Sequence, residues 1–138
     1  MHHLTSAWHR LPGAPAESLQ ALRIEFGENL PNEYTEFLGW SNGGEGSLPV
    51  QPYTLCLDSA EDVLRYWREG DYRQDFPGFL VIGSNGAGEY IAFDTRQPKS
   101  WPVVALDMTN IDLSETVLPV AQDFATLLNF IAVPRADA

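Results

Sequence analysis

Two strand-like segments separated by a glycine-rich loop constrain the fold more than any other feature. Phe79–Gly83 reads F-L-V-I-G and Tyr90–Asp94 reads Y-I-A-F-D, and both have the length and the β-branched or aromatic content of strands. The loop Gly83–Gly88 between them is G-S-N-G-A-G. Asn-Gly is typical of a tight hairpin turn because both residues accept a positive φ. The sequence therefore predicts an antiparallel hairpin with Asn85 and Gly86 at its turn.

A phosphate-binding loop is the alternative for this run of glycines. A dinucleotide fingerprint has G-x-G-x-x-G opening a helix, whereas here the order is G-x-x-G-x-G and a strand follows. A Walker loop continues with Lys and a hydroxyl residue, whereas Glu89 and Tyr90 follow the last glycine here. The carboxylate of Glu89 would repel a phosphate, so a hairpin is the preferred interpretation.

Apolar residues at helical spacing predict helices before the hairpin. The first spans Ala16–Phe26. The second starts at Pro31, because a proline lacks only an N–H that a first helical turn leaves free. The third follows Asp58 or Ser59, either of which can cap it, and Glu61 completes a capping box with Asp58.

The remaining segments complete an α+β pattern. Residues 46–57 predict one or two short strands, which Pro49 and Pro52 assign to a sheet edge. Pro102–Asp107 predicts another strand, and Phe124–Ile131 has the apolar stripe of a last helix. The expected fold is α+β: N-terminal helices, a central antiparallel or mixed sheet of about five or six strands, and a C-terminal helix packed on the sheet.

The length of 138 residues fits one domain with one core. We expect a lead-in over residues 1–15 and a single domain over residues 16–133. No apolar run approaches the ~20 residues of a membrane span, and the N-terminus is too polar for a secretory signal. We therefore expect a cytoplasmic protein without a membrane partner, and the oligomeric state stays open.

The charge argues against a nucleic-acid partner. The chain has 8 basic and 19 acidic residues, for a formal net charge of −11, and the acidic residues are spread along the chain. Phosphate binding requires a basic face. The acidity serves either solubility or the electrostatic attraction of a basic protein partner. From charge alone, solubility is the preferred interpretation.

The sequence indicates no catalytic, metal or cofactor site. His2, His3 and His9 all lie in the first nine residues, so the body of the domain has no histidine for a Ser-His-Asp or Cys-His arrangement. Cys56 is the single cysteine, and its apolar run Y-T-L-C-L favours a buried hydrophobe over a nucleophile. Carboxylates distant in sequence can still meet as a general acid–base pair, which stays open. We predict a protein that is not an enzyme.

Two segments carry a family resemblance. Leu30–Gly44, L-P-N-E-Y-T-E-F-L-G-W-S-N-G-G, resembles the signature helix of the SUKH superfamily, the Smi/Knr-like domain. Leu80–Asp94 is similar to the family's strand, glycine turn and strand ending in an aromatic residue and Asp, although Ser84, Asn85 and Glu89 replace frequent aspartates. The matching positions are interpreted as architectural: Leu30, Pro31, Tyr34, Phe37, Leu38, Gly43, Gly86 and Asp94.

The resemblance implies a function by binding. Bacterial members are typically immunity proteins that neutralise secreted toxin domains, often nucleases or deaminases of polymorphic toxin systems, and fungal members look like regulators of cell-wall synthesis and signalling. It implies here a non-enzymatic immunity protein whose acidic face binds a basic toxin domain. A regulatory interaction domain without a toxin partner is the alternative. A third class, an enzyme or small-molecule binder, predicts a deep apolar pocket with convergent polar groups.

Loop position and charge suggest where a partner would bind. Trp40 falls off the apolar face of its predicted helix and precedes a glycine loop, and aromatic residues are enriched at interface hot spots. We predict Trp40 as an anchor within an acidic surface. The acidic members of that predicted surface are Glu45, Asp71, Asp75 and Glu89.

Overall fold

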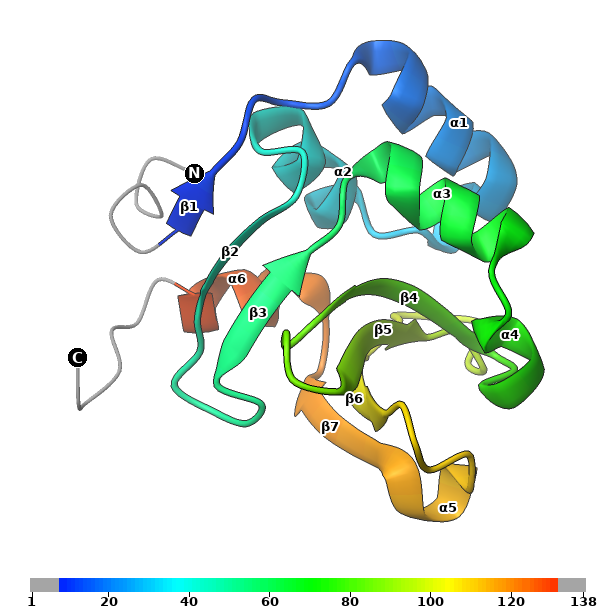
Figure 1. Cartoon of the computed structure of the whole chain (residues 1–138). Helices are drawn as coiled ribbons and strands as arrows, with labels where there is room; N and C mark the ends of the chain where they lie inside the picture. Colours follow the sequence, from blue (N-terminus) through cyan, green and yellow to red (C-terminus); the bar gives the residue numbers. More distant parts are fainter. Residues whose placement is uncertain (1–7, 132–138) are drawn as a thin grey trace.

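The strand-forming segments pair in the order in which they occur along the chain. The computed structural model of the protein describes residues 8–131, and its strands form one seven-stranded sheet, β1 to β7, with every neighbouring pair antiparallel (Figure 1). The predicted α+β fold is confirmed, with more strands than expected. The strands are β1 (Trp8–Arg10), β2 (Gly44–Ser47), β3 (Thr54–Leu57), β4 (Phe79–Ser84), β5 (Glu89–Asp94), β6 (Val103–Asp107) and β7 (Val117–Ala121).

The predicted helices also form, together with shorter ones. The second helix begins at Asn32, one residue later than predicted, and Pro31 is its N-cap. Each helix within residues 8–131 is too short or too polar to cross a bilayer. The helices are α1 (Ala16–Phe26), η2 (Gly27–Asn29, a 3-10 turn), α2 (Asn32–Trp40), α3 (Ala60–Glu69), α4 (Tyr72–Asp75), α5 (Leu113–Thr116) and α6 (Phe124–Ile131).

The larger core lies between the first face of the sheet and the helices α1, α2, α3 and α6. Its centre is a set of aromatic rings in edge-to-face contact. The Tyr34 ring of α2 lies 5.2 Å from the rings of both Phe93 and Phe124, and Phe37 lies 5.7 Å from Phe124. These contacts join the signature helix α2 to the sheet and to the C-terminal helix, which packs on the sheet as predicted.

A smaller core lies on the second face of the sheet. Phe79, Val81 and Leu106 are buried there beneath Tyr72 and Phe76. The short helices α4 and α5 supply this cover, and Figure 1 shows both beside the β4–β7 part of the sheet. The second face is therefore covered along only part of its width.

The hairpin forms as predicted, but its turn differs. Gly86 and Gly88 have positive φ values of 73° and 99°, whereas Asn85 does not have a positive φ. Instead, the side-chain Oδ1 of Asn85 accepts hydrogen bonds from the backbone N–H groups of Ala87 (2.9 Å) and Glu89 (3.0 Å). Asn85 therefore stabilises the loop as an Asx-type acceptor rather than through its backbone conformation.

The two prolines of residues 46–57 do not mark a sheet edge. Pro49 and Pro52 lie in the connection between β2 and β3, and β3 pairs with β4 on its other side. That prediction was wrong because prolines outside the ladder remove no ladder hydrogen bond. One edge is instead β1, which lies within the predicted lead-in; its Trp8 is buried, 5.5 Å from the ring of Phe37.

Candidate binding cleft on the second face of the sheet

A row of side chains crosses the second face of the sheet. The strand register aligns Glu45 (β2), Cys56 (β3), Ser84 (β4) and Tyr90 (β5), so their side chains lie on one face. Leu106 of β6 continues the row and is buried in the second core. Glu45 is exposed, and Cys56 and Ser84 are half-buried. We call the part of this face formed by Glu45, Cys56 and Ser84 the open half.

A cleft of about 250 Å³ lies where the open half meets the covered part of the face. Tyrosine rings line much of its wall beside two aspartates, and residues of the sheet form its floor. The lining residues are Asp58, Tyr66, Gly70, Asp71, Tyr72, Val81, Gly83, Ser84 and Tyr90.

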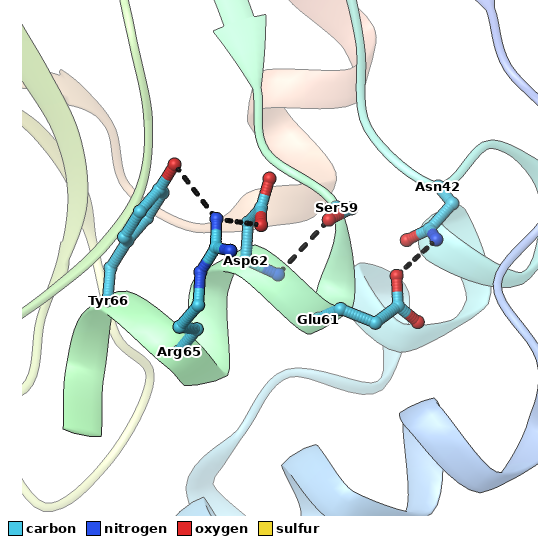
Figure 2. A network of polar contacts seen from close by, with 6 residues as sticks. All are labelled: Asn42, Ser59, Glu61, Asp62, Arg65 and Tyr66. Atoms are coloured by element: carbon cyan, nitrogen blue, oxygen red, sulfur yellow. Dashed lines mark hydrogen bonds and ion pairs between the residues drawn. The ribbon is translucent and has the colours of Figure 1, made fainter. Parts of the chain in front are cut away.

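Asp58 reaches the cleft because its neighbour Ser59 caps helix α3. The Asp58 N–H donates to the Ile82 carbonyl (2.9 Å), so the chain still follows β4 at this point. Ser59 Oγ then accepts the Asp62 N–H (3.1 Å), as Figure 2 shows. The predicted capping box of Asp58 and Glu61 is wrong, since Glu61 accepts a hydrogen bond from Asn42 Nδ2 (2.8 Å) instead.

The Asp58 carboxylate is an unsatisfied anion. It is half-buried, and no hydrogen-bond donor within residues 8–131 reaches it. Burial, and then repulsion from Asp62, raises the pKa of Asp58 to about 6. The carboxyl group is still mostly ionised at neutral pH, so the cleft holds a negative charge that no described residue compensates.

The tyrosines form an aromatic wall. Tyr72 is buried, and its hydroxyl accepts the Val81 N–H (3.2 Å). Burial raises the pKa of Tyr72 to about 12, so the hydroxyl stays protonated. The Tyr90 ring lies 6.0 Å from that of Tyr72, and Tyr66, 40% exposed on α3, forms the outer rim.

The basic residue at the rim is already engaged. Figure 2 shows Arg65 between Asp62 and Tyr66: its Nη2 lies 2.6 Å from Asp62 Oδ1 and 3.5 Å from the Tyr66 hydroxyl. Its guanidinium carbon lies 5.1 Å from the centre of the Tyr66 ring. Arg65 therefore offsets the charge of Asp62 and holds the tyrosine, but forms no hydrogen bond with Asp58.

Comparison with known protein families gives a match over most of the chain. Residues 13–129 match the family model described as the SMI1 / KNR4 family (SUKH-1). The chain belongs to the SMI1 / KNR4 family. The resemblance seen in Leu30–Gly44 and Leu80–Asp94 is therefore confirmed. A search of curated proteins gives no match.

Most residues that the family resemblance marks as architectural have structural roles in this SMI1 / KNR4 domain. The apolar ones are buried, Pro31 precedes α2, and the two glycines adopt positive φ values of 96° and 73°. Asp94 pairs with Arg96 on the second face. The apolar residues are Leu30, Tyr34, Phe37 and Leu38, and the glycines are Gly43 and Gly86.

The structure brings only part of the predicted partner-binding set near the cleft. Asp71 lines the cleft, and Glu45 lies on the open half. Asp75 is exposed at the end of α4, and Glu89 accepts a hydrogen bond from Asn85 Nδ2 (2.9 Å) in the hairpin loop. Neither lines the cleft.

Trp40 lies on the other side of the fold. It packs beside Phe37 at 5.9 Å, and the Arg10 guanidinium carbon lies 4.6 Å from its ring. Its role as an anchor stays a prediction, and the structure separates it from the cleft. Sequence reasoning missed Asp58, Tyr66 and Tyr90; the available signal was an acidic residue directly after a strand, next to a serine able to cap the helix.

Cys56 is more exposed than predicted. Its thiol is half-buried and lies 3.7 Å from Glu45 Oε2 on the open half. Burial and then the Glu45 carboxylate raise the pKa of Cys56, so the thiol stays protonated and weakly nucleophilic. Among the residues described, no group of three or more His, Cys, Asp or Glu side chains is arranged to hold a metal ion.

Proposed function

We propose that this SMI1 / KNR4 protein is a non-enzymatic immunity protein that binds and neutralises a secreted bacterial toxin domain with a basic surface. The observation that carries the proposal is the cleft, where the half-buried Asp58 carboxylate has no donor within residues 8–131. Membership of the family supports a protein that acts by binding.

Charge complementarity supports a basic partner. The protein has a formal net charge of −11, and Glu45, Asp58 and Asp71 lie on or beside the open half of the sheet. A nuclease toxin needs a basic surface for nucleic acid, and an acidic inhibitor that covers this surface would block access to it. Complementary charges would also accelerate the encounter of the two proteins.

The side chains of the cleft favour binding over catalysis. A general acid–base pair that works near neutral pH needs two groups whose pKa values lie near that pH. Tyr72 has a pKa of about 12, and its hydroxyl is already hydrogen-bonded to the Val81 N–H. Tyr72 is therefore not a matched proton donor for Asp58.

The proposal is tested by co-expression with the C-terminal domain of a large secreted protein encoded beside this chain. We expect the two to elute together, the cell to survive the toxin, and the complex to weaken steeply as salt rises from about 0.1 M to 0.5 M. Absence of both a complex and protection with every neighbouring secreted protein would contradict the proposal and favour a regulatory domain.

A further inference from the structure

The protein itself shows what binds a buried carboxylate beside an aromatic ring. Asp94 pairs with Phe79 across β4 and β5, so both lie on the second face of the sheet. The Asp94 oxygens accept hydrogen bonds from Nε and Nη2 of Arg96, each at 2.9 Å. The Arg96 guanidinium carbon lies 4.8 Å from the centre of the Phe79 ring. One guanidinium therefore satisfies the carboxylate and covers the ring.

Asp58 has similar surroundings on the same face but lacks an arginine. Tyr66, Tyr72 and Tyr90 line the cleft with it. The nearby Arg65 is committed to Asp62 at 2.6 Å, and no other donor within residues 8–131 reaches the Asp58 oxygens. The cleft thus has the acceptor and the aromatic surface of the Asp94 site without the guanidinium.

We propose that the cleft binds one arginine side chain of the protein partner, with its guanidinium on the Asp58 carboxylate and against the rings of Tyr66 and Tyr90. This inference rests on the proposed function for the cleft as the binding site, and it names the chemical group that the cleft takes. The space of about 250 Å³ is large enough for a side chain and too small for a folded element.

A guanidinium fits this site better than an ammonium group. It is planar, so one edge can donate to both oxygens of Asp58 while its face lies against a tyrosine ring. It is also less strongly hydrated than the lysine ammonium, which reduces the cost of entering a half-buried cleft. Asp71, which also lines the cleft, adds a further negative charge that favours either cation.

The test is an NMR titration of the full chain with N-acetyl-arginine amide. N-acetyl-citrulline amide has nearly the same shape without the charge, and N-acetyl-lysine amide has the charge without the planar fork. We expect saturable shifts of the backbone amides of Gly70, Gly83 and Ser84, and binding at least about tenfold weaker for the citrulline probe. No saturable shift in the cleft, or equal binding of the citrulline or lysine probe, would overturn the inference.

Variants locate the binding to Asp58. Asp58→Asn keeps the shape of the side chain and should abolish arginine binding, and Tyr66→Ala on the exposed rim should weaken it. Glu36→Gln removes one exposed carboxylate of α2 that does not line the cleft, so it is the matched control and should bind as the unaltered protein does. Unchanged binding by Asp58→Asn would overturn the inference.

The inference and the proposed function can fail separately. If a toxin domain forms a complex that Asp58→Asn leaves intact, the arginine site is wrong and the immunity function stands. If the arginine probe binds at Asp58 but no toxin domain does, the site stands, and the partner belongs to a regulatory process instead.

Discussion

Asp94 and Asp58 lie on the same face of one sheet, but among the described residues only Asp94 is paired with a cation. Asp94 is followed two residues later by Arg96, whose side chain turns back to it and closes an ion pair at 2.9 Å. Asp58 is followed by helix α3, which brings Asp62 and its like charge nearby. The local sequence therefore gives Asp94 its cation and leaves Asp58 unpaired within residues 8–131.

The two carboxyl groups also differ in what their charge does to the fold. Burial alone would raise the pKa of Asp94, but the hydrogen bonds and charge of Arg96 lower it overall. Burial and Asp62 raise the pKa of Asp58 to about 6. Ionisation thus stabilises the folded protein at Asp94 and destabilises it at Asp58, as expected when a binding site is retained at a cost in stability.

The largest effect is expected from Asp94→Ala. The substitution leaves Arg96 without the acceptor of its Nε, Nη2 and backbone N–H groups. We expect the free energy of unfolding to fall by about 2 kcal/mol, since hydrogen bonds to charged groups contribute more than neutral ones. Urea unfolding near neutral pH measures it, with Asp75→Ala as the exposed control. A loss of unfolding free energy no larger than that of the control would show that the Asp94–Arg96 pair does not stabilise the fold.

A smaller effect of opposite sign is expected from Asp58→Asn. Because the folded-state pKa of Asp58 is raised, its contribution to stability is full below its unfolded pKa and is lost as the pH rises through about 6. The asparagine side chain at position 58 does not titrate. After allowance for partial solvent screening, it should be more stable than the unaltered protein by about 1 kcal/mol near pH 8, with the difference vanishing near pH 4.

Urea unfolding across that pH range checks the Asp58→Asn prediction. Both proteins contain every other titratable group, so the difference between their stability profiles reports on the Asp58 carboxyl group. A variant that is less stable near pH 8 would show that the Asp58 charge is structural. Asp62 is the neighbouring charge that raises the pKa of Asp58. The other charged and titratable groups around this part of the cleft are Arg65 of α3, Tyr34 of α2, Asp71 and Tyr72 at α4, Tyr90 of β5, and Cys56 and Glu45 of the open half.

The smallest effect is expected from Arg65→Ala. Its ion pair with Asp62 is exposed, so stability should not change measurably. Removing the guanidinium leaves the charge of Asp62 uncompensated, and the pKa of Asp58 should rise further. A carbon-detected NMR titration of the side-chain carboxyl groups measures this, with Arg68→Ala, which breaks a pair with Glu25, as the control. An unchanged or lower pKa of Asp58 would show that Arg65 does not offset the charge of Asp62.

Long periodic segments made most of the fold predictable, whereas short elements depend on distant contacts. The stripe in Phe124–Ile131 and the runs of β4 and β5 carry their own signals. β1 has three residues, and its Trp8 is buried only because β2 and α2 lie beside it. The preference of proline for edge strands holds at Pro119, which lies in the edge strand β7. It does not apply to Pro49 and Pro52, because they lie outside the strands.

The cleft was less predictable than the fold because its key residue has two local interpretations. Asp58 and Ser59 are both good caps for α3, and local sequence does not distinguish them. The hydrogen bond from the Asp58 N–H to the Ile82 carbonyl of β4 decides the matter, since it holds Asp58 beside β4 and leaves the cap to Ser59. The tyrosines that complete the cleft come from α3, α4 and β5, and only the folded chain brings them together.

The most direct test is the pKa of the Asp58 carboxyl group, measured by NMR with and without saturating N-acetyl-arginine amide. We predict a value of about 6 in the free protein and a clear fall on binding, toward the lowered pKa of Asp94 beside Arg96. A pKa that stays the same at saturation, or an Asp58 that titrates at its ordinary value in the free protein, would contradict the claim that this carboxylate is left open for a partner's arginine.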